Sequence, residues 1–567
     1  MQSTSSTRIA GHVLIEALVT QGVSRVYGVP GESYLAALDG FTQFADAIKF
    51  IVTRQEGGAA YMAEAEGKLT GRPGVCFVTR GPGATNACIG VHTAFQDSTP
   101  MVLLIGDVAQ DARDREAFQE VDFVGMFTPL AKRVERIDDP ERIPEYVQRA
   151  FATALNGRPG PVVLVLPEDM LTRTCAATVL PRVEPVRGGA DLQKLEQVLT
   201  RLRQATKPLM ILGGGGWTAA AAADIRRFAQ AWQIPVGCTF RFQDLFDNRD
   251  SLYAGDVGLG IGAGLANAIR EADVLLVIGA RMGEASSGGY SLIPVGSQRQ
   301  GLIHVHADPE ELNRVYTPEL ALCAGMPAIA SAMAGAASPT ACNWRDWTDR
   351  ITNAFRTHSD AEAARRPMPG NVDMFSVIQT VSRTLPANVI CTNGAGNFAT
   401  WLHRFHKLPG FDSGQRYQLA PTNGSMGYGV PAGVAAAIAS GRPVFTIAGD
   451  GDFLMNGQEL ATASAEGVKT VVLLLNNGMY GTIRMHQERE FPGRVSGSGL
   501  RNPDFCLLAQ GYGYHAERVT HTADFEAAWT RAWAHPGGAL IDLVLDPEVI
   551  TPRSTLAEIR EASRGKA

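Results

Sequence analysis

The chain has 567 residues, of which 45% are hydrophobic and 19% are charged, and its formal net charge is −6. A chain of this length can fold into about three domains that each bury a core. Its basic residues form no long cluster and its acidic residues are scattered, which argues against nucleic acid and membrane surfaces as partners.

The N-terminal residues predict a helix of the folded protein rather than a targeting segment. Their apolar stretch is interrupted by Glu16 and lacks the basic start of a secretory signal. No apolar run reaches the length that would span a membrane. Eight cysteines are dispersed without a CxxC pair, which indicates buried free thiols in a reducing compartment. We therefore expect a cytoplasmic protein.

Short apolar runs alternate with alanine-rich helical patterns along the chain, which is typical of parallel α/β layers. Three such segments can be separated, at residues 1–183, 190–340 and 370–567. We predict an α/β fold of three domains, each built on a parallel sheet. The runs at 101–107 and 444–450 both follow glycine-rich helical segments, which suggests that the first and last domains share an architecture.

Three polar residues of the first segment are candidates for chemistry. Glu32 stands in the glycine turn of YGVPGES, Glu56 precedes a helix of small residues, and Gln119 lies in DREAFQEVDF. Each also has a plain structural interpretation, as a turn residue or as a solvated residue in the first turn of a helix. These residues alone do not decide between a chemical role and a structural role.

Glycine-punctuated loops recur in the other two segments. The central one carries PLMILGGGGW and LIHVHADP, and the last carries CTNGAGNFATW at 391–401 and LAPTNGSMGYGVPAG at 419–433. Such loops serve structural turns more often than ligands. Met426, within the last of them, would ordinarily be a core residue.

The run from Gly449 to Asn477 is the most informative part of the chain. An apolar strand at 444–448 ends in Gly-Asp-Gly, a helix is expected at 458–466, and a strand at 471–475 ends in two asparagines. Asp450 and Asn477 therefore fall at the carboxyl ends of neighbouring strands, where parallel sheets bind ligands. Carboxylate, amide and main-chain oxygens suit Mg²⁺ or Ca²⁺ better than zinc, and free N–H groups beside glycines favour phosphate. We interpret the run as a metal and diphosphate site, and two ordinary turns are the alternative.

This run resembles the cofactor motif of the thiamine diphosphate enzymes. Residues 74–108 resemble the pyrimidine-binding domain of acetohydroxyacid synthase and pyruvate oxidase, and the resemblance extends over nearly the whole chain. It implies thiamine diphosphate and Mg²⁺ as cofactors. It also implies a pyrimidine-binding domain, a central Rossmann-like domain and a diphosphate-binding domain, in that order.

The resemblance implies a role for each candidate residue. Glu56 would hydrogen-bond the aminopyrimidine ring, and Gln119 matches a glutamine of acetolactate-forming enzymes. Met426 would support the bent cofactor. The metal ligands would be Asp450, Asn477 and Met479, and the remaining cofactor contacts would be Ala395, Gly396, Asn397, Phe398, Gly451 and Asp452. In the family the cofactor lies between two subunits, which implies a homodimer or homotetramer.

The reaction implied is decarboxylation of a 2-oxo acid such as pyruvate, with carboligation to a second carbonyl compound. The run QDSTP at 96–100 lacks the paired histidines of pyruvate decarboxylases. A simple decarboxylase, an FAD-dependent oxidase and a non-catalytic paralogue remain alternatives. Glu32 and His486 replace residues that the synthases use near the substrate, so the substrates stay open. FAD also stays open, because GARMGEASSGGY departs from the family's flavin loop.

Overall fold

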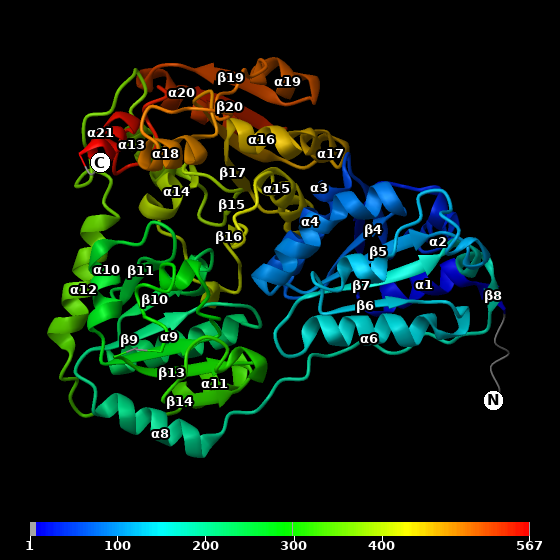
Figure 1. The fold of residues 1–567 in the computed structure, drawn as a ribbon, viewed down its shortest axis with the longest axis horizontal. Coiled ribbons are helices and arrows are strands. Elements are labelled where there is room, and N and C mark those ends of the chain that lie inside the picture. The colour runs from blue at the N-terminus through cyan, green and yellow to red at the C-terminus, as the bar shows by residue number, and fades with distance from the viewer. Residues whose placement is uncertain (1–6, 297–298, 566–567) are drawn as a thin grey trace.

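The computed structural model describes residues 7–296 and 299–565, which form three α/β domains around six-stranded sheets (Figure 1). Every strand pairing within these three sheets is parallel. The central strands are buried along their whole length, as expected of strands covered by helices on both faces. The predicted fold class is confirmed.

The first domain carries its sheet in the order β3-β2-β4-β5-β7-β6. Its strands are β2 (Arg25–Gly28), β3 (Lys49–Val52), β4 (Gly74–Val78), β5 (Met101–Asp107), β6 (Arg133–Arg136) and β7 (Pro161–Pro167). A short antiparallel pair, β1 (Arg8–Ile9) and β8 (Thr174–Cys175), closes the domain. Its helices are α1 (Ala10–Thr20), α2 (Leu35–Gln43), α3 (Glu56–Thr70), α4 (Gly81–Asp97), α5 (Phe123–Phe127), α6 (Ile143–Leu155) and α7 (Glu168–Thr172).

The central domain has the strand order β11-β10-β9-β12-β13-β14, which is that of a dinucleotide-binding sheet. Its strands are β9 (Pro208–Leu212), β10 (Val236–Thr239), β11 (Tyr253–Val257), β12 (Val274–Ile278), β13 (Gly301–His306) and β14 (Leu320–Cys323). Its helices are α8 (Leu192–Arg203), α9 (Ala219–Trp232), α10 (Ala263–Glu271), α11 (Met326–Ala334) and α12 (Arg345–His358). Trp344, Trp347 and Ile351 belong to the central core. We therefore propose that this domain extends to His358, beyond the predicted boundary at 340.

The last domain carries its sheet in the order β16-β15-β17-β18-β20-β19. Its strands are β15 (Ile390–Asn393), β16 (Gln418–Leu419), β17 (Val444–Gly449), β18 (Thr470–Asn476), β19 (His515–Val519) and β20 (Ala539–Val544). Its helices are α13 (Met374–Thr384), α14 (Ala399–Phe405), α15 (Gly429–Ser440), α16 (Asp450–Asn456), α17 (Leu460–Ala465), α18 (Gly481–Glu490), α19 (Phe505–Gly511), α20 (Thr522–Ala534) and α21 (Leu556–Arg564), with a 3₁₀ turn, η8 (Gly457–Glu459), after α16.

The first and last sheets share one topology. When the strands of each sheet are numbered along the chain, both sheets run 2-1-3-4-6-5. The shared architecture expected from residues 101–107 and 444–450 is therefore present. The two runs are not equivalent, however, because β5 is the fourth strand of its sheet and β17 is the third. β4 is the counterpart of β17, and β5 is the counterpart of β18.

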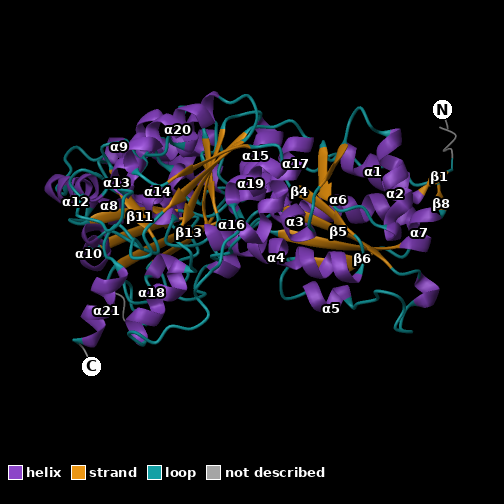
Figure 2. Cartoon of the chain, turned by 90° about the horizontal axis from the view of Figure 1, so that it is seen from above, coloured by secondary structure: helices purple, strands orange, loops and turns teal. Residues whose placement is uncertain are grey.

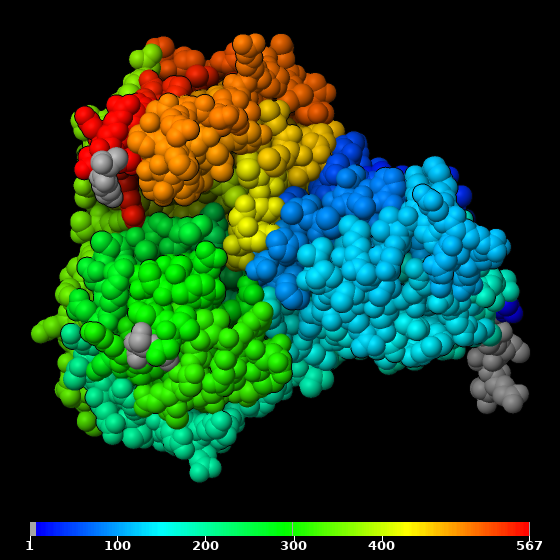
Figure 3. Space-filling model, in the orientation of Figure 1, coloured from blue at the N-terminus to red at the C-terminus, as the bar shows by residue number. Residues whose placement is uncertain are grey.

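The first and last domains also share a core. Buried residues of α3, α4 and α15 form one apolar cluster with residues of both sheets, among them Ala60, Val91 and Val434. Figure 2 shows α3 and α15 lying between the two sheets, and Figure 3 shows the two domains in contact at the surface. The linker from residue 176 to 191 contains no helix or strand. It connects the first domain to α8, as its proline and glycine content predicts.

The cysteines are free, but not all are buried as predicted. Cys323 is exposed because it ends the edge strand β14, and Cys88, Cys342 and Cys506 are half-buried. None of the helices in the described part of the chain is long and apolar enough to cross a membrane.

Candidate active site

A cavity of about 220 Å³ lies at the carboxyl edge of the last sheet. It stands at the crevice between β15 and β17, where the strand order reverses and where such sheets bind ligands. The structure brings together there all the candidates from the last domain, namely Ala395, Gly396, Asn397, Phe398, Met426, Asp450, Gly451, Asp452, Asn477 and Met479.

Asp450 is the first residue of α16 and only 2% exposed. One carboxylate oxygen accepts a hydrogen bond from the Gly451 N–H (2.9 Å), and the other accepts from the Gly478 N–H (2.8 Å) and the Asn502 amide (2.7 Å). Burial raises the pKa of Asp450, although these hydrogen bonds lower it. The helix expected at 458–466 is present as η8 and α17 (Leu460–Ala465), but the preceding helix α16 was not predicted. A carboxylate at the first position of α16 is favoured by the free N–H groups of a helix start.

The surroundings of Asp450 fit a hard cation. The described groups that donate hydrogen bonds to its carboxylate are neutral main-chain and amide groups, and a buried carboxylate without a cation is costly. Asn477 and Met479 line the same cavity and can offer an amide and a main-chain oxygen, which are ligands that Mg²⁺ accepts. The described residues contain no cluster of three or more His, Cys, Asp or Glu side chains that could hold a metal by themselves. Diphosphate oxygens would have to complete the coordination.

Asp452 holds two walls of the cavity together. It is 3% exposed, and its carboxylate accepts from the Gly427 N–H at 2.8 Å. Burial raises the pKa of Asp452 to about 7, against the lowering effect of hydrogen bonds from the Gly427 and Ala395 backbones. A Cβ at Gly394 would lie 2.0 Å from the Asp452 carboxylate, so only glycine fits there. Asp452 therefore ties the loop of Met426 to the loop at 395–398.

The candidates of the first domain gather at the carboxyl edge of its own sheet. Glu56 begins α3, and its carboxylate accepts from the Asn86 amide at 3.0 Å. Arg80, after β4, donates to Glu32 (2.5 Å) and to Glu168 (2.8 Å). Gln119 follows β5 in a left-handed conformation, and its main-chain oxygen accepts from the Gly81 N–H. The ion pair with Arg80 was not predicted for Glu32.

Within one chain the two groups of candidates remain apart. Glu56, Glu32 and Gln119 do not line the cavity of the last domain. The start of α3 is instead held beside η8, where the Arg54 N–H donates to the buried Glu459 at 3.0 Å. η8 lies at the end of α16 that is remote from Asp450.

Sequence reasoning missed Thr482, which lines the cavity, and Asn502, which contacts Asp450 from outside its lining. Asn502 bridges Asp450 to the main sheet by donating also to the Asn476 side chain at 2.9 Å, and Thr482 accepts from the Asn397 N–H at 3.0 Å. Both belong to segments that return to the cavity from elsewhere in the domain. No local pattern marks them, because their role depends on tertiary contact.

The glycine loop of the central domain lies at the crevice of its sheet. In this strand order the dinucleotide phosphates bind at the crevice between β9 and β12. Trp217 is buried there and donates from its indole to the Gly213 oxygen at 2.9 Å. A Cβ at Gly279 would lie 2.4 Å from that oxygen and 2.9 Å from the Met326 sulfur. Trp217 and Met326 pack at the crevice and also line a cavity of about 270 Å³ beside it, together with Gly215 and Gly216.

Comparison with known proteins agrees with the division into three domains. Residues 8–126, 195–333 and 394–543 match the N-terminal TPP binding domain, the central domain and the C-terminal TPP binding domain of the thiamine pyrophosphate enzymes. The chain is 31% identical to an acetolactate synthase of Arthrospira platensis, over 96% of this chain and 95% of the relative. It is 30% identical to the acetolactate synthase isozyme 2 large subunit of Escherichia coli, over 94% and 95%, and 30% identical to a probable acetolactate synthase large subunit of Methanocaldococcus jannaschii, over 95% and 92%.

Proposed function

Since the chain belongs to the thiamine pyrophosphate (thiamine diphosphate) enzymes and is of the acetolactate synthase type, we propose that it decarboxylates a 2-oxo acid such as pyruvate and joins the product to a second carbonyl compound. The observation that carries this proposal is the cavity at the β15–β17 crevice, which gathers the cofactor and metal candidates of the last domain. Thiamine diphosphate, when bound, supplies a thiazolium carbon that adds to the substrate carbonyl and accepts the electrons left by carbon dioxide.

In this proposal the last domain anchors the cofactor. Asp450, Asn477 and Met479 hold Mg²⁺, and the loops at 395–398 and 451–452 receive the diphosphate. Free N–H groups at the start of α16 favour an anion there. Met426 supports the cofactor from the wall that Asp452 fixes.

The first domain supplies the proton chemistry. Glu56 would hydrogen-bond the aminopyrimidine ring and exchange a proton with it, and Asn86 orients its carboxylate. Gln119 and Glu32 lie at the same edge of the first sheet and would contact the substrate, and Arg80 fixes the direction of Glu32.

We propose that the complete site needs a second copy of the chain, in a homodimer or a homotetramer. Glu56 does not reach the cavity of its own chain. Large apolar side chains are exposed beside both halves of the site. Phe118, next to Gln119, is 72% exposed. On α16, Leu454 is 42% exposed and Met455 is 45% exposed. Exposed apolar groups of this kind mark contact surfaces. The free cysteines support a reducing compartment, and we propose the cytoplasm.

Purified protein incubated with thiamine diphosphate, Mg²⁺ and pyruvate tests the proposal, with separate assays for carbon dioxide, acetolactate, acetaldehyde and peroxide. We expect carbon dioxide with acetolactate. Acetaldehyde without acetolactate would identify a simple decarboxylase, and peroxide would identify an oxidase. The visible spectrum of the protein as purified reports any bound flavin. The Glu56→Gln variant should keep cofactor binding and lose turnover, which a non-catalytic paralogue would not show.

A further inference from the structure

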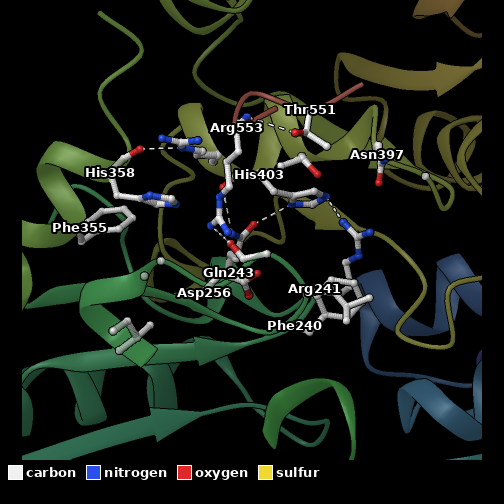
Figure 4. A pocket seen from close by; sticks show the side chains of 18 of the residues that line it. Phe240, Arg241, Gln243, Asp256, Phe355, His358, Asn397, His403, Thr551 and Arg553 are labelled. Atoms are coloured by element: carbon white, nitrogen blue, oxygen red, sulfur yellow. Dashed lines mark hydrogen bonds between the residues drawn. The ribbon is translucent and has the colours of Figure 1, made fainter. Parts of the chain in front are cut away.

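A second and larger chamber, of about 610 Å³, lies between the central and last domains. Its walls come from the ends of β10 and β11, from α12 and α14, from α18, and from the segment before α21. In the view of Figure 4, Arg553 reaches down from that segment between His358 and His403. The volume lies within the range of cavities that bind small molecules.

The chamber is strongly basic. Four arginines line it, namely Arg241, Arg404, Arg489 and Arg553, against a single carboxylate, Asp256. Arg404 donates to the main-chain oxygen of His358 at 2.8 Å, and Arg553 donates to the oxygens of Gly260 and Ile261. Neither arginine has a carboxylate partner within the described part of the chain.

Arg404, Arg553 and His358 are close enough to act on one another electrostatically. Burial and the Arg553 charge lower the pKa of Arg404 to about 10. Burial and both arginines lower the pKa of His358 to about 4. The half-buried Arg404 and the more exposed Arg553 thus place two positive charges at the wall of the chamber without an anion among the described residues, where a ligand anion would be attracted to both.

Unpaired polar atoms are a second, independent indication that the chamber binds a polar ligand. Arg241 Nε, the Tyr253 hydroxyl, Asp256 Oδ1 and His406 Nδ1 line this chamber and are buried without a hydrogen-bond partner among the described residues. Buried polar groups are normally satisfied. Donors and acceptors gathered in this way fit a ligand that also carries carbonyl or hydroxyl oxygens.

The chamber opens onto the candidate active site. Ala395, Gly396, Asn397, Gly424 and Thr482 line both cavities. A molecule whose charged end lies at Arg404 and Arg553 can therefore extend toward the loop that receives the cofactor. A cavity lined by the glycine loop of the central domain shares no lining residue with this chamber.

We propose that Arg404 and Arg553 bind a second carboxylate or a phosphate group on a 2-oxo acid substrate, so that this substrate carries a second negative charge in addition to its 2-oxo acid carboxylate. This inference rests on the proposed function and specifies its substrate class. The two arginines come from different parts of the last domain, and charge-assisted hydrogen bonds from two guanidinium groups recognise such an anion strongly.

The test compares two 2-oxo acids of equal chain length, 2-oxoglutarate and 2-oxopentanoate, which differ in the second carboxylate. Binding to the cofactor-loaded protein is measured by calorimetry, and turnover is measured with and without pyruvate. We expect 2-oxoglutarate to bind at least about tenfold more tightly. Arg404→Gln should remove this preference, whereas Arg404→Lys should retain part of it. Arg356→Gln, which removes an exposed charge from α12 outside the chamber, should retain all of it.

Several outcomes would overturn the inference. Equal affinity for the two acids would show that the arginines do not bind the second anionic group. An unchanged preference in both Arg404→Gln and Arg553→Gln would show the same. Tight binding of 2-oxoglutarate without turnover, in a protein that converts pyruvate, would make the chamber an effector site. If no 2-oxo acid is converted at all, the proposed function fails first, and this inference fails with it. Inorganic phosphate as a competitor of 2-oxoglutarate reports whether the site also accepts a phosphate group.

Discussion

In the proposed site, Asp450 is the residue on which the anchoring of the cofactor would depend most directly. Its buried carboxylate accepts hydrogen bonds from neutral groups, and burial raises its pKa. Asp450→Asn should cost the apoprotein about 1–3 kcal/mol of stability, because its amide nitrogen would meet N–H donors that the carboxylate now accepts from. It should also abolish the stabilisation that thiamine diphosphate and Mg²⁺ give together. Thermal unfolding with and without both ligands measures this.

The control for that experiment is Asp346→Asn, an exposed residue of α12. It should keep the full shift in unfolding temperature on addition of both ligands. An equally large shift in Asp450→Asn would contradict the metal assignment. Asp450 and Asn477 could be predicted because neighbouring parallel strands end at one edge of a sheet. Asn502 could not, because it reaches Asp450 from a loop with no pattern of its own.

His306 makes the stability of the central domain depend on pH. Burial and the neighbouring His304 lower the pKa of His306 to about 4, and its Nδ1 accepts from the Asp308 N–H at 3.0 Å. The unfolded chain takes up a proton near pH 6.5 while the folded chain does not. Stability is therefore complete above about pH 6.5 and falls as the pH drops towards 4, by about 3 kcal/mol.

Replacing His306 by Asn keeps an acceptor for Asp308 and removes the titrating ring. The variant should lose less unfolding free energy between pH 6.5 and 4 than the wild type does. Urea unfolding across this range measures the difference. His521→Asn, a change at an exposed histidine, should leave the pH dependence as it is in the wild type. A parallel decline in His306→Asn and wild type would refute the assignment.

At the scale of elements, the junction of α3 with η8 positions Glu56. Glu459 is fully buried, accepts from the Arg54 N–H at 3.0 and 3.2 Å, and accepts from the Thr462 hydroxyl at 2.6 Å. Glu459→Gln places an amide where two donors converge, so it should cost about 1–3 kcal/mol of stability. Turnover should fall while cofactor affinity changes little. Urea unfolding, calorimetry and a turnover assay separate these effects.

Glu466→Gln is the matched control, because Glu466 also links the last domain to the first, through Lys49. The Lys49 side chain of that ion pair is 62% exposed, so the pair should contribute little. Unimpaired turnover in a destabilised Glu459→Gln protein would show that the junction does not position Glu56.

The same elements show where sequence reasoning reached its limit. The strands β17 and β18 were predicted nearly to the residue, because buried parallel strands are short continuous apolar runs. The helix expected at 458–466 is present as η8 and α17, but α16 was not predicted, because Gly449-Asp450-Gly451 was interpreted as a turn. A Cβ at Gly451 would lie 2.4 Å from the Tyr480 ring, and one at Gly457 would lie 2.7 Å from the Phe453 ring. These glycines serve close packing inside helical segments, which local sequence does not distinguish from a turn.

At the scale of the whole molecule, two domains of one topology each present half of a site at the carboxyl edge of a sheet. The first holds Glu56 and the last holds Asp450, and within one chain these edges do not meet at the cavity. In a symmetric dimer, the first domain of each chain would complete the cavity in the last domain of the other. One isologous interface would therefore complete both sites. The exposed apolar residues beside each half suit that contact.

A complementation experiment decides whether the site is shared between chains. Glu56→Gln and Asp450→Asn should each be inactive as a pure protein. Co-expressed in equal amounts, half of the dimers formed at random are mixed, and each mixed dimer contains one intact site. About a quarter of the wild-type activity should therefore return. If Glu56 served the cavity of its own chain, no mixed dimer would contain an intact site, and the mixture would stay inactive. The control is sedimentation of each variant, which should show a dimer. An inactive mixture then cannot be explained by a failure to form dimers.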